Sequence, residues 1–321
     1  MPGNYQGKRV ARSHKVTMIV IAAVVAAAAA AAIFFLKYYD GAEKNPDAAH
    51  ICSGYGAGSD RGPDVSTFQD PPKVSDEPKA PPYDFSQPVP EREPVENSYF
   101  DDAAFVGDSR TDGFMLYSGI GTGENLAANG VSIFRLAERK SLTIDGEKYT
   151  PLEALALKQY GKIYIALGVN ELGYNNDKGY YEKFCAAVDE VRRVQPNAVI
   201  YIQSLIPVNE AQYLAATGHD YLTNDHLRIY NQLMQQVAEE KKVAYVNVYE
   251  AFADENGSLP EGDSRDGVHL YKESCQRWLE YLRTHTVEFD TLYPDGPPPV
   301  EVPDPEPAGP DTSTADGSGQ G

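Results

Sequence analysis

Short apolar runs alternate with amphipathic helical patterns along the middle of this chain, and this alternation limits the folds open to it. Five runs have the length and composition of buried strands: residues 103–106, 131–134, 163–167, 199–202 and 243–248. Residues 180–194, 226–241 and 272–283 place apolar side chains at helical spacing. Strands that are apolar throughout suit a parallel sheet covered by helices on both faces. Residues 98–290 are therefore predicted to form a doubly wound α/β layer with one core.

The two ends of the chain differ from this middle part. Residues 37–97 and 291–321 are rich in proline, acids, glycine and serine, so we expect both to be disordered. Residues 16–36 hold nothing more polar than Thr17, and four bases but no acid precede them. Such a run can cross a bilayer as a helix, with the basic flank inside. The predicted order is a cytoplasmic basic tail over 1–15, a transmembrane anchor over 16–36, a stalk over 37–97, an extracellular domain over 98–290 and a tail over 291–321.

Residues 16–36 are also compatible with a cleavable signal peptide. The alanines offer small-residue cleavage sites, whereas the apolar run continues through residues 33–36 and is longer than most signal sequences. In either case we expect everything after residue 37 to be exported.

The exported part is strongly acidic. The chain holds 47 acidic residues against 28 basic ones, and four of these bases precede the apolar run. Such a surface repels nucleic acid, so the charge argues against a nucleic-acid partner. The three cysteines, Cys52, Cys185 and Cys275, show neither a disulfide framework nor zinc spacing. We expect Cys185 and Cys275 to be buried thiols, with a bridge between them as the alternative.

The residue types needed for acyl transfer occur in three short motifs. Ser109 and Asn170 each follow the end of a predicted strand, and Asp266 lies three residues before His269. Ligands of doubly wound sheets bind at the carboxyl ends of the strands. A serine hydroxyl becomes a nucleophile when a base takes its proton, and a carboxylate can orient that base. The three motifs therefore predict a single catalytic site.

Each of these residues also has a purely structural explanation. Ser109 suits the N-cap of the helix that follows it, and Asp266 suits the N-cap of the last predicted helix. Asn170 is favoured in turns at strand ends. Among the histidines, His219 in a loop is the alternative base to His269.

Four segments together resemble the four motif blocks of the SGNH hydrolases, also called the GDSL esterase family: Gly107-Asp108-Ser109, Gly130, Gly168-x-Asn170 and Asp266-x-x-His269. The resemblance implies a three-layer α/β/α sandwich around a five-stranded parallel sheet. It implies Ser109 as the nucleophile, His269 as the base and Asp266 as the group that orients His269. The oxyanion hole would comprise the N–H groups of Ser109 and Gly130 and the side chain of Asn170.

Two positions depart from the family pattern. Leucine often follows the serine, but here Arg110 does. Its guanidinium could contact a carboxylate or phosphate on the substrate, or pair with Asp108 or Asp112. The third block usually ends in aspartate, but here Glu171 ends it, which leaves the hydrogen bonding of that loop open. The second block is the least defined, because other glycines lie nearby.

The resemblance implies a serine esterase that forms an acyl-Ser109 intermediate, and the apolar run over residues 16–36 predicts that it is exported and tethered to the membrane. Family members at the bacterial surface include deacetylases and O-acetyltransferases of wall polymers. We therefore expect a deacetylase of cell-wall glycan, with an O-acyltransferase on wall polymers as the alternative. The sequence contains no Walker loop, metal-ligand cluster or dinucleotide fingerprint, so no cofactor or metal is expected. The rivals from other classes are a non-catalytic glycan-binding surface protein, whose 22 tyrosines would stack on sugars, and an extracellular scaffold.

Overall fold

The computed structural model describes residues 82–299. At its centre lies a five-stranded sheet in the order β2-β1-β5-β6-β7, and all neighbouring strands in it are parallel. The strands are β1 (Ala103–Gly107), β2 (Glu124–Asn125), β5 (Lys162–Ala166), β6 (Val199–Gln203) and β7 (Ala244–Val246). The predicted α/β class with a five-stranded parallel sheet is therefore confirmed.

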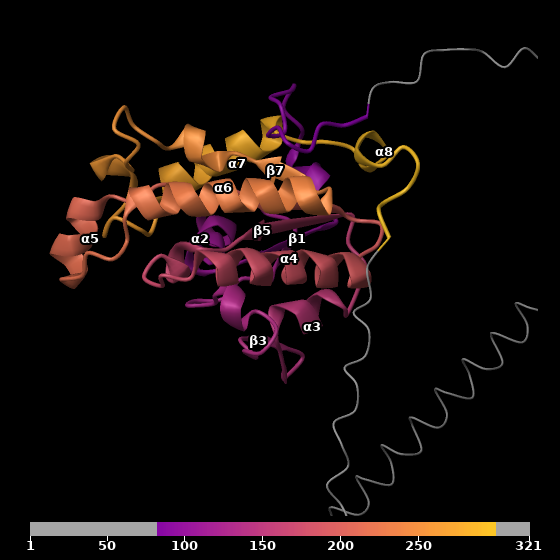
Figure 1. The fold of residues 1–321 in the computed structure, drawn as a ribbon, viewed down its shortest axis with the longest axis horizontal. Coiled ribbons are helices and arrows are strands. Elements are labelled where there is room, and N and C mark those ends of the chain that lie inside the picture. The colour runs from indigo at the N-terminus through magenta and orange to yellow at the C-terminus, as the bar shows by residue number, and fades with distance from the viewer. Residues whose placement is uncertain (1–81, 300–321) are drawn as a thin grey trace, which may run out of the picture. The chain divides into compact units, whose positions relative to one another are not determined.

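Helices cover both faces of this sheet (Figure 1). One face carries α3 (Pro151–Leu155), α4 (Asp177–Val194) and α6 (Asn224–Lys241), and Figure 1 shows α4 and α6 side by side across it. The other face carries α2 (Ser109–Tyr117), α7 (Lys272–Thr284) and α8 (Phe289–Leu292). The remaining elements are α5 (Glu210–Thr217), the hairpin β3 (Leu142–Ile144) and β4 (Glu147–Tyr149), and the 3₁₀ turns η2 (Asn97–Phe100), η3 (Ile133–Arg135), η4 (Val169–Glu171), η5 (Val248–Ala251) and η6 (Glu261–Asp263).

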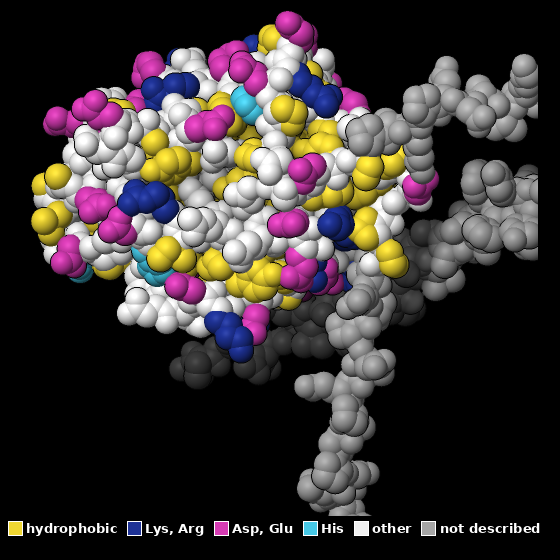
Figure 2. Space-filling view, turned by 45° about the horizontal axis from the view of Figure 1, so that its top comes forward, with side chains coloured by type: hydrophobic (Ala, Val, Ile, Leu, Met, Phe, Trp, Pro, Cys, Tyr) yellow, Lys and Arg dark blue, Asp and Glu magenta, His cyan; other side chains and the backbone are white. Residues whose placement is uncertain are grey.

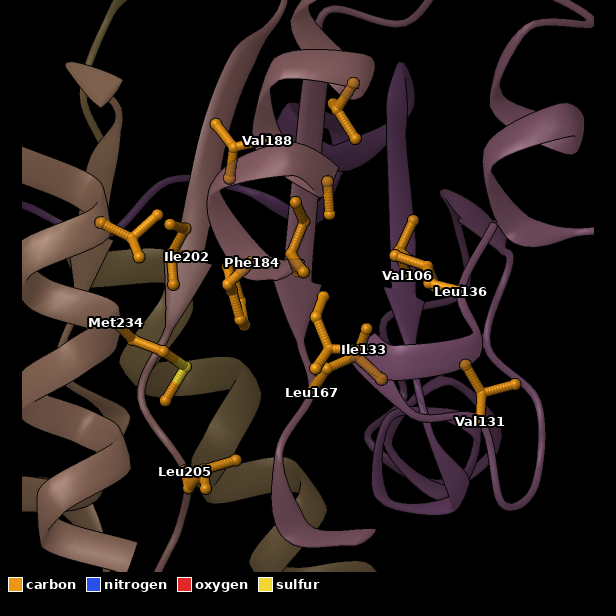
Figure 3. Close-up of a cluster of buried hydrophobic side chains, with 14 of the residues drawn as sticks. Val106, Val131, Ile133, Leu136, Leu167, Phe184, Val188, Ile202, Leu205 and Met234 are labelled. Atoms are coloured by element: carbon orange, nitrogen blue, oxygen red, sulfur yellow. The ribbon is translucent and has the colours of Figure 1, made fainter. Parts of the chain in front are cut away.

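Alternate residues of each strand supply two separate cores. Successive side chains of a strand point to opposite faces, so Val106 and Ile202 join the core beneath α4 and α6. Figure 3 shows Ile202 beside Phe184 and Met234, and Val106 beside Leu136 and Ile133. On the other face, the rings of Tyr164 and Tyr201 stack with centroids 4.4 Å apart. Strands buried on both faces explain the continuous apolar runs in the sequence.

The long helices follow the predicted stripes. In α6, the buried side chains include Leu227, Tyr230, Met234 and Val237. Thr223 is the N-cap of this helix, and its hydroxyl accepts a hydrogen bond from the N–H of residue 226. Full burial of each such apolar side chain contributes about 1.5–3 kcal/mol relative to exposure, so the apolar stripe fixes the helix on the sheet.

The second predicted strand, over residues 131–134, is wrong. Residues 133–135 form the 3₁₀ turn η3, and the edge position beside β1 belongs to β2. Past β2, the N–H of Ala128 donates to the carbonyl of Gly107, so the chain still runs along β1 there. Val131 and Ile133 are apolar because their side chains pack into the core beneath α4 and α6, although their segment is irregular (Figure 3). A short apolar run does not by itself distinguish a strand from an irregular segment whose side chains are buried.

The folded domain is longer than the predicted 98–290. Val89 is buried, and its N–H donates to the carbonyl of Tyr245, so part of the predicted stalk packs on the domain. At the other end, Tyr293 is buried beyond the predicted boundary. Predicted segments 1–15 and 16–36 lie outside the described residues, as do most of the stalk and the end of the tail. No helix within 82–299 is long and apolar enough to cross a membrane.

Two further sequence features can be checked on the described part. Cys185 and Cys275 are both free and buried, so the bridge between them that the sequence left open is absent. On the face drawn in Figure 2, acidic side chains are scattered between basic and hydrophobic ones rather than gathered into one patch. This scatter fits a charge that keeps the domain soluble.

Candidate active site

Ser109 is the first residue of α2, and only Asp108 separates it from the end of β1. Asp108 is the N-cap, and its carboxylate accepts the N–H of Arg110 at 2.9 Å. Asp108 therefore fills the capping role that the sequence also allowed for Ser109, and the serine hydroxyl is left for another partner. The N–H of Ser109 belongs to the first turn, where N–H groups have no acceptor within the helix.

A glycine is required where β1 passes into α2. A Cβ on Gly107 would lie 2.0 Å from Oγ1 of Thr111 and 2.8 Å from the carbonyl oxygen of Ala166. Both contacts are far inside van der Waals distance, and one of them is with backbone that cannot move aside. The glycine thus lets the helix start at once, which places Ser109 at the carboxyl edge of the sheet.

The structure brings Ser109, His269 and Asp266 into one hydrogen-bonded chain. Oγ of Ser109 lies 3.0 Å from Nε2 of His269. Nδ1 of the same ring lies 2.8 Å from Oδ2 of Asp266. If Nδ1 carries the proton, Nε2 faces the serine as an acceptor, which is the arrangement a general base needs. His219, the alternative base, lies in a loop with its ring 5.6 Å from that of Tyr221.

A short turn between Ser264 and Leu270, which form an isolated β-bridge, holds the base and its carboxylate. Oδ1 of Asp266 accepts the backbone N–H of Val268 at 3.1 Å and that of His269 at 2.9 Å. Asp266 therefore closes its own turn. The N-cap of α7 is Tyr271, so the capping role that the sequence allowed for Asp266 is wrong.

The same hydrogen bonds set the charge state of Asp266. Its partial burial alone would raise the pKa, but hydrogen bonds from the backbone and ring of His269 and from Val268 outweigh burial and lower the pKa. The carboxylate is thus ionised across the neutral range. It can stabilise the positive charge that appears on the ring when the ring takes a proton.

Three hydrogen-bond donors lie near the serine and can stabilise an oxyanion. The side-chain nitrogen of Asn170, in η4 after β5, donates one hydrogen to the carbonyl of Val131 at 2.8 Å, which leaves its second hydrogen available. Among the described residues, the backbone N–H groups of Ser109 and Gly130 have no hydrogen-bond partner. Ser109, Gly130 and Asn170 line one depression. Of the nearby glycines, Gly123 instead packs against the ring of Phe105.

Glu171 connects the two loops that carry Gly130 and Asn170. Its side chain is fully buried, and Oε1 accepts the N–H of Ile133 in a short hydrogen bond. Burial raises its pKa to about 8, and the nearby Asp108 adds to this effect. The longer glutamate, in place of the usual aspartate, thus reaches across to the neighbouring loop, which answers the question that the sequence left open.

Arg110 points inward rather than toward a carboxylate. Its guanidinium donates to the carbonyls of Ile206 at 2.8 Å and Pro207 at 3.2 Å, and the residue is only 6% exposed. The sequence allowed a pairing with Asp108 or Asp112, but the guanidinium donates its hydrogen bonds to these two carbonyls instead. Arg110 does line the depression beside Ser109, so its contact with a substrate stays a prediction.

Asp108 is a second buried carboxyl group beneath the serine. Its burial raises its pKa to about 6, although the N–H of Arg110 and the charge of Arg110 oppose the shift. Burial in turn lowers the pKa of Arg110 to about 10. Asp108 and Arg110 therefore form a buried layer beneath the nucleophile Ser109.

Two depressions meet at the triad and share Ser109, Asn170 and His269. The larger one measures about 620 Å³. The smaller measures about 170 Å³. The larger is also lined by Arg110, Asp112, Gly113, Leu116, Tyr117, Asn129, Gly130, Arg265, Leu270, Tyr271 and Cys275. The smaller is also lined by Val169, Tyr213, Thr217, Tyr221, Leu222, Asp266 and Val268. Ser109 thus has an open, wide site on one side and a small pocket on the other.

The sequence did not point to the residues that anchor the Asn170 loop. His226 holds it through the carbonyl of Leu172, 2.9 Å from Nδ1, while Nε2 lies 2.8 Å from Oδ1 of Asp177. The hydroxyl of Tyr230 donates to the carbonyl of Glu171 at 3.1 Å. In the sequence, only the spacing of four between His226 and Tyr230 hints that both lie on the inner face of the helix. Within residues 82–299, no cluster of His, Cys, Asp and Glu has the arrangement of a metal site.

Comparison with known proteins gives one match that covers most of the domain. The family model of the GDSL-like Lipase/Acylhydrolase family matches residues 105–276, which contain all the predicted site residues. The comparison with curated proteins found no match.

Several solved structures are similar to this chain at low identity. A Streptococcus pneumoniae protein provisionally named a platelet activating factor is 24% identical, with a TM-score of 0.47, over 60% of this chain and 84% of its own. A GDSL-like lipase from Bacteroides thetaiotaomicron is 15% identical, with a TM-score of 0.44, over 60% and 89%. The periplasmic domain of a lipopolysaccharide acetyltransferase from Salmonella ser. Paratyphi A is 15% identical, with a TM-score of 0.40, over 57% and 82%. On the strength of the match over residues 105–276, this chain belongs to the GDSL-like lipase/acylhydrolase family.

Proposed function

We propose that this chain is a serine ester hydrolase that works through an acyl-Ser109 intermediate. The observation that carries the proposal is the chain of contacts from Oγ of Ser109 through His269 to Asp266, at 3.0 and 2.8 Å, beside free N–H donors. Family membership indicates ester hydrolase or acyltransferase chemistry, and this geometry supplies each role that such chemistry needs.

In the proposed reaction, Nε2 of His269 takes the proton of Ser109 as Oγ attacks the ester carbonyl. The carbonyl oxygen becomes negative and accepts hydrogen bonds from the N–H groups of Ser109 and Gly130 and from the side chain of Asn170. The intermediate collapses, the C–O bond to the alcohol breaks, and His269 returns its proton to the leaving oxygen. Water then repeats the sequence on the acyl-serine and releases the acid.

For the substrate we propose an acylated cell-wall glycan, and the form of the cleft supports it. The larger depression is open, and its walls include the exposed rings of Tyr117 and Tyr271. Exposed aromatic faces suit sugar rings, whose C–H surfaces are apolar. An O-acyltransferase would share the first half of the reaction and pass the acyl group to a glycan hydroxyl instead of water.

We further propose that residues 16–36 tether the domain to the cell membrane, with the N-terminus inside and the domain outside. The apolar run and its basic flank support this proposal. Protease added to intact cells should remove the domain and leave residues 1–36 protected. Retention of the full-length chain in cells whose membrane proteins are cleaved by the same protease would place the domain inside and overturn the proposed orientation.

Covalent labelling tests the enzymatic proposal directly. A fluorophosphonate probe should label the wild-type protein and fail to label Ser109→Ala, while Ser118→Ala, a serine at the far end of α2, should label normally. A folded wild-type protein that takes no label would instead favour a non-catalytic glycan-binding protein. Release of acetate from acetylated glycan, against acetate transfer to an added oligosaccharide, separates hydrolase from transferase.

A further inference from the structure

Arg265 is an exposed charged residue of the larger depression that the catalytic scheme leaves without a role. Its side chain is 78% exposed, and its closest acidic group is Oδ2 of Asp266 at 4.0 Å. That separation is too long for a hydrogen bond, and this oxygen already faces the ring of His269. No other carboxylate of residues 82–299 forms an ion pair with Arg265. Because Arg265 also lines the larger depression, its exposed donors are available to a ligand bound there.

The backbone beneath Arg265 is fixed to the catalytic base. Its N–H points to the carbonyl of His269 at 3.4 Å, and the Ser264–Leu270 bridge closes the turn on both sides. The carbonyl of Gly267 accepts the N–H of Asn209, which ties the turn to the body of the domain. The backbone of Arg265 therefore keeps a set position relative to His269, and a group that its side chain binds would lie near the catalytic base.

The position of Arg265 identifies which half of an ester it can reach. His269 must lie next to the leaving oxygen in order to return its proton to it, so the alcohol half of the substrate lies on the His269 side. His269 lines both depressions, but the smaller one, of about 170 Å³, suits a small acyl group such as acetyl, which leaves the alcohol half to the larger depression that Arg265 lines. Arg265 is therefore placed to contact the alcohol half.

The other charged groups of the larger depression already have partners. Arg110 is buried and donates to two carbonyls. On the wall, Oδ1 of Asp112 accepts the side-chain amide of Asn125 at 2.8 Å. The chain holds 47 acids and 28 bases, so its solubility does not depend on Arg265, whose one ion pair among the described residues is with Asp266 at 4.0 Å. A guanidinium fork is the group that best matches a carboxylate or a phosphate.

We propose that Arg265 binds an anionic group on the alcohol half of the ester, so that the enzyme prefers acylated acidic saccharides to neutral ones. Tyr271 and Tyr117, which are 44% and 51% exposed in the same depression, would contact the sugar ring while Arg265 binds its charge. The inference rests on the proposed ester hydrolysis at Ser109 and names the class of substrate that it acts on.

The test compares kcat/KM for matched esters in the full-length protein and its variants. The substrates are an acetylated galacturonic acid oligomer, an acetylated galactose oligomer of the same length, acetylated glucose 6-phosphate, and an uncharged aryl acetate. The wild type should prefer at least one anionic ester to the neutral oligomer, and the carboxylate and phosphate arms show which anion it takes. In Arg265→Gln this preference should fall about tenfold or more, as expected on loss of a hydrogen bond between charged groups. The loss should lie mainly in KM, and Arg265→Lys should restore part of it.

A matched control removes the same charge elsewhere. Arg228 lies on α6, pairs with Asp225 and does not line the larger depression, so Arg228→Gln should keep the wild-type preference. Added salt should reduce the preference of the wild type and leave that of Arg265→Gln unchanged.

Three outcomes overturn the inference. Equal wild-type rates on acidic and neutral oligomers remove the preference itself. An equal fall in kcat on all substrates, aryl acetate included, in Arg265→Gln would mean that the arginine supports Asp266 instead. A wild-type protein that neither hydrolyses aryl acetate nor takes a fluorophosphonate label contradicts the proposed function, and the inference with it. In the first of these cases, continued hydrolysis of aryl acetate would show that the proposed function stands and that this inference alone is contradicted.

Discussion

Asn170 is the one proposed oxyanion donor that belongs to a side chain, so a substitution can remove it alone. Asn170→Ala should lower kcat by about 10²–10³-fold with little change in KM, because the amide stabilises charge that appears only in the transition state. Steady-state kinetics on an aryl acetate measure both terms. Because the amide also holds the carbonyl of Val131, the melting temperature should be measured beside the rate. Asn129→Ala removes another carboxamide from the same depression and should keep kcat. A kcat for Asn170→Ala within threefold of wild type would remove Asn170 from the site.

Glu171 should make the stability of the domain depend on pH. Burial raises its pKa to about 8 from a reference value of 4.5, so the folded state binds more protons than the unfolded state between these two values. Its contribution to stability is therefore complete below pH 4.5 and is lost as the pH rises toward 8. Asp108 behaves in the same way up to its pKa of about 6, so the window from pH 6 to 8 isolates Glu171.

The substitution Glu171→Gln tests this directly. Glutamine keeps an oxygen that can accept the N–H of Ile133 but does not ionise, so urea unfolding should show less loss of stability between pH 6 and 8 than in the wild type. An equal or steeper loss in the variant would mean that Glu171 is ionised in the folded protein throughout this range.

At the scale of elements, the turn that carries Asp266 and His269 depends on one glycine. Gly267 has φ +83°, and a Cβ there would lie 2.3 Å from the carbonyl oxygen of Asn209. Gly267→Ala should therefore displace His269, with a large loss of kcat and a destabilisation of about 1–3 kcal/mol from backbone strain. Gly262→Ala is the matched control, because no atom lies within 4 Å of the Cβ it would add. Wild-type rate and melting temperature in Gly267→Ala would show that the turn can adapt.

The sequence predicted those elements whose pattern comes from the sheet itself. Four of the five predicted apolar runs contain a strand of the sheet, because strands buried on both faces must be apolar throughout. The prediction of a strand in the second run was wrong because Val131 and Ile133 are apolar for a different reason: their side chains pack into a core from an irregular loop. The true edge strand, β2, has only two residues and pairs on one side, so it needs no apolar pattern.

The site was predictable in its motifs and not in its orientations. Ser109, Asp266 and His269 could be named from local spacing, and the structure places them together. Local spacing in the sequence could not predict which way the side chains of Arg110 and Arg265 point. The side chain of Arg110 turns inward because it donates to two carbonyls of the loop after β6. The side chain of Arg265 is exposed and lines the cleft. Such partners come from segments distant in sequence, and only the folded chain brings them together.

At the scale of the whole molecule, the helix α7 separates the cleft from the place where the chain enters and leaves the domain. It starts at Lys272, just after His269, and its 13 residues span about 20 Å. At its far end, the carbonyl of Thr284 accepts the N–H of Arg92. There, Phe85 near the start of the described chain stacks on Tyr293 near its end, with ring centroids 6.1 Å apart. A tether attached before residue 82 would thus join the domain at the end away from the cleft.

This arrangement makes the segment 82–97 part of the folded domain, which truncation can test. A fragment that starts at residue 82 should unfold at the same urea concentration as one that starts at residue 37. A fragment that starts at residue 98 should be less stable by several kcal/mol, because it loses the buried Val89 and the backbone hydrogen bonds that the segment donates to β7 and α7. The rate of ester hydrolysis by this fragment should fall only near its unfolding transition. The missing segment contacts the end of α7 that lies away from His269, so its removal does not disturb the cleft directly. Equal midpoints for all three fragments would show that residues 82–97 only lie on the surface, and the domain would then begin at residue 98.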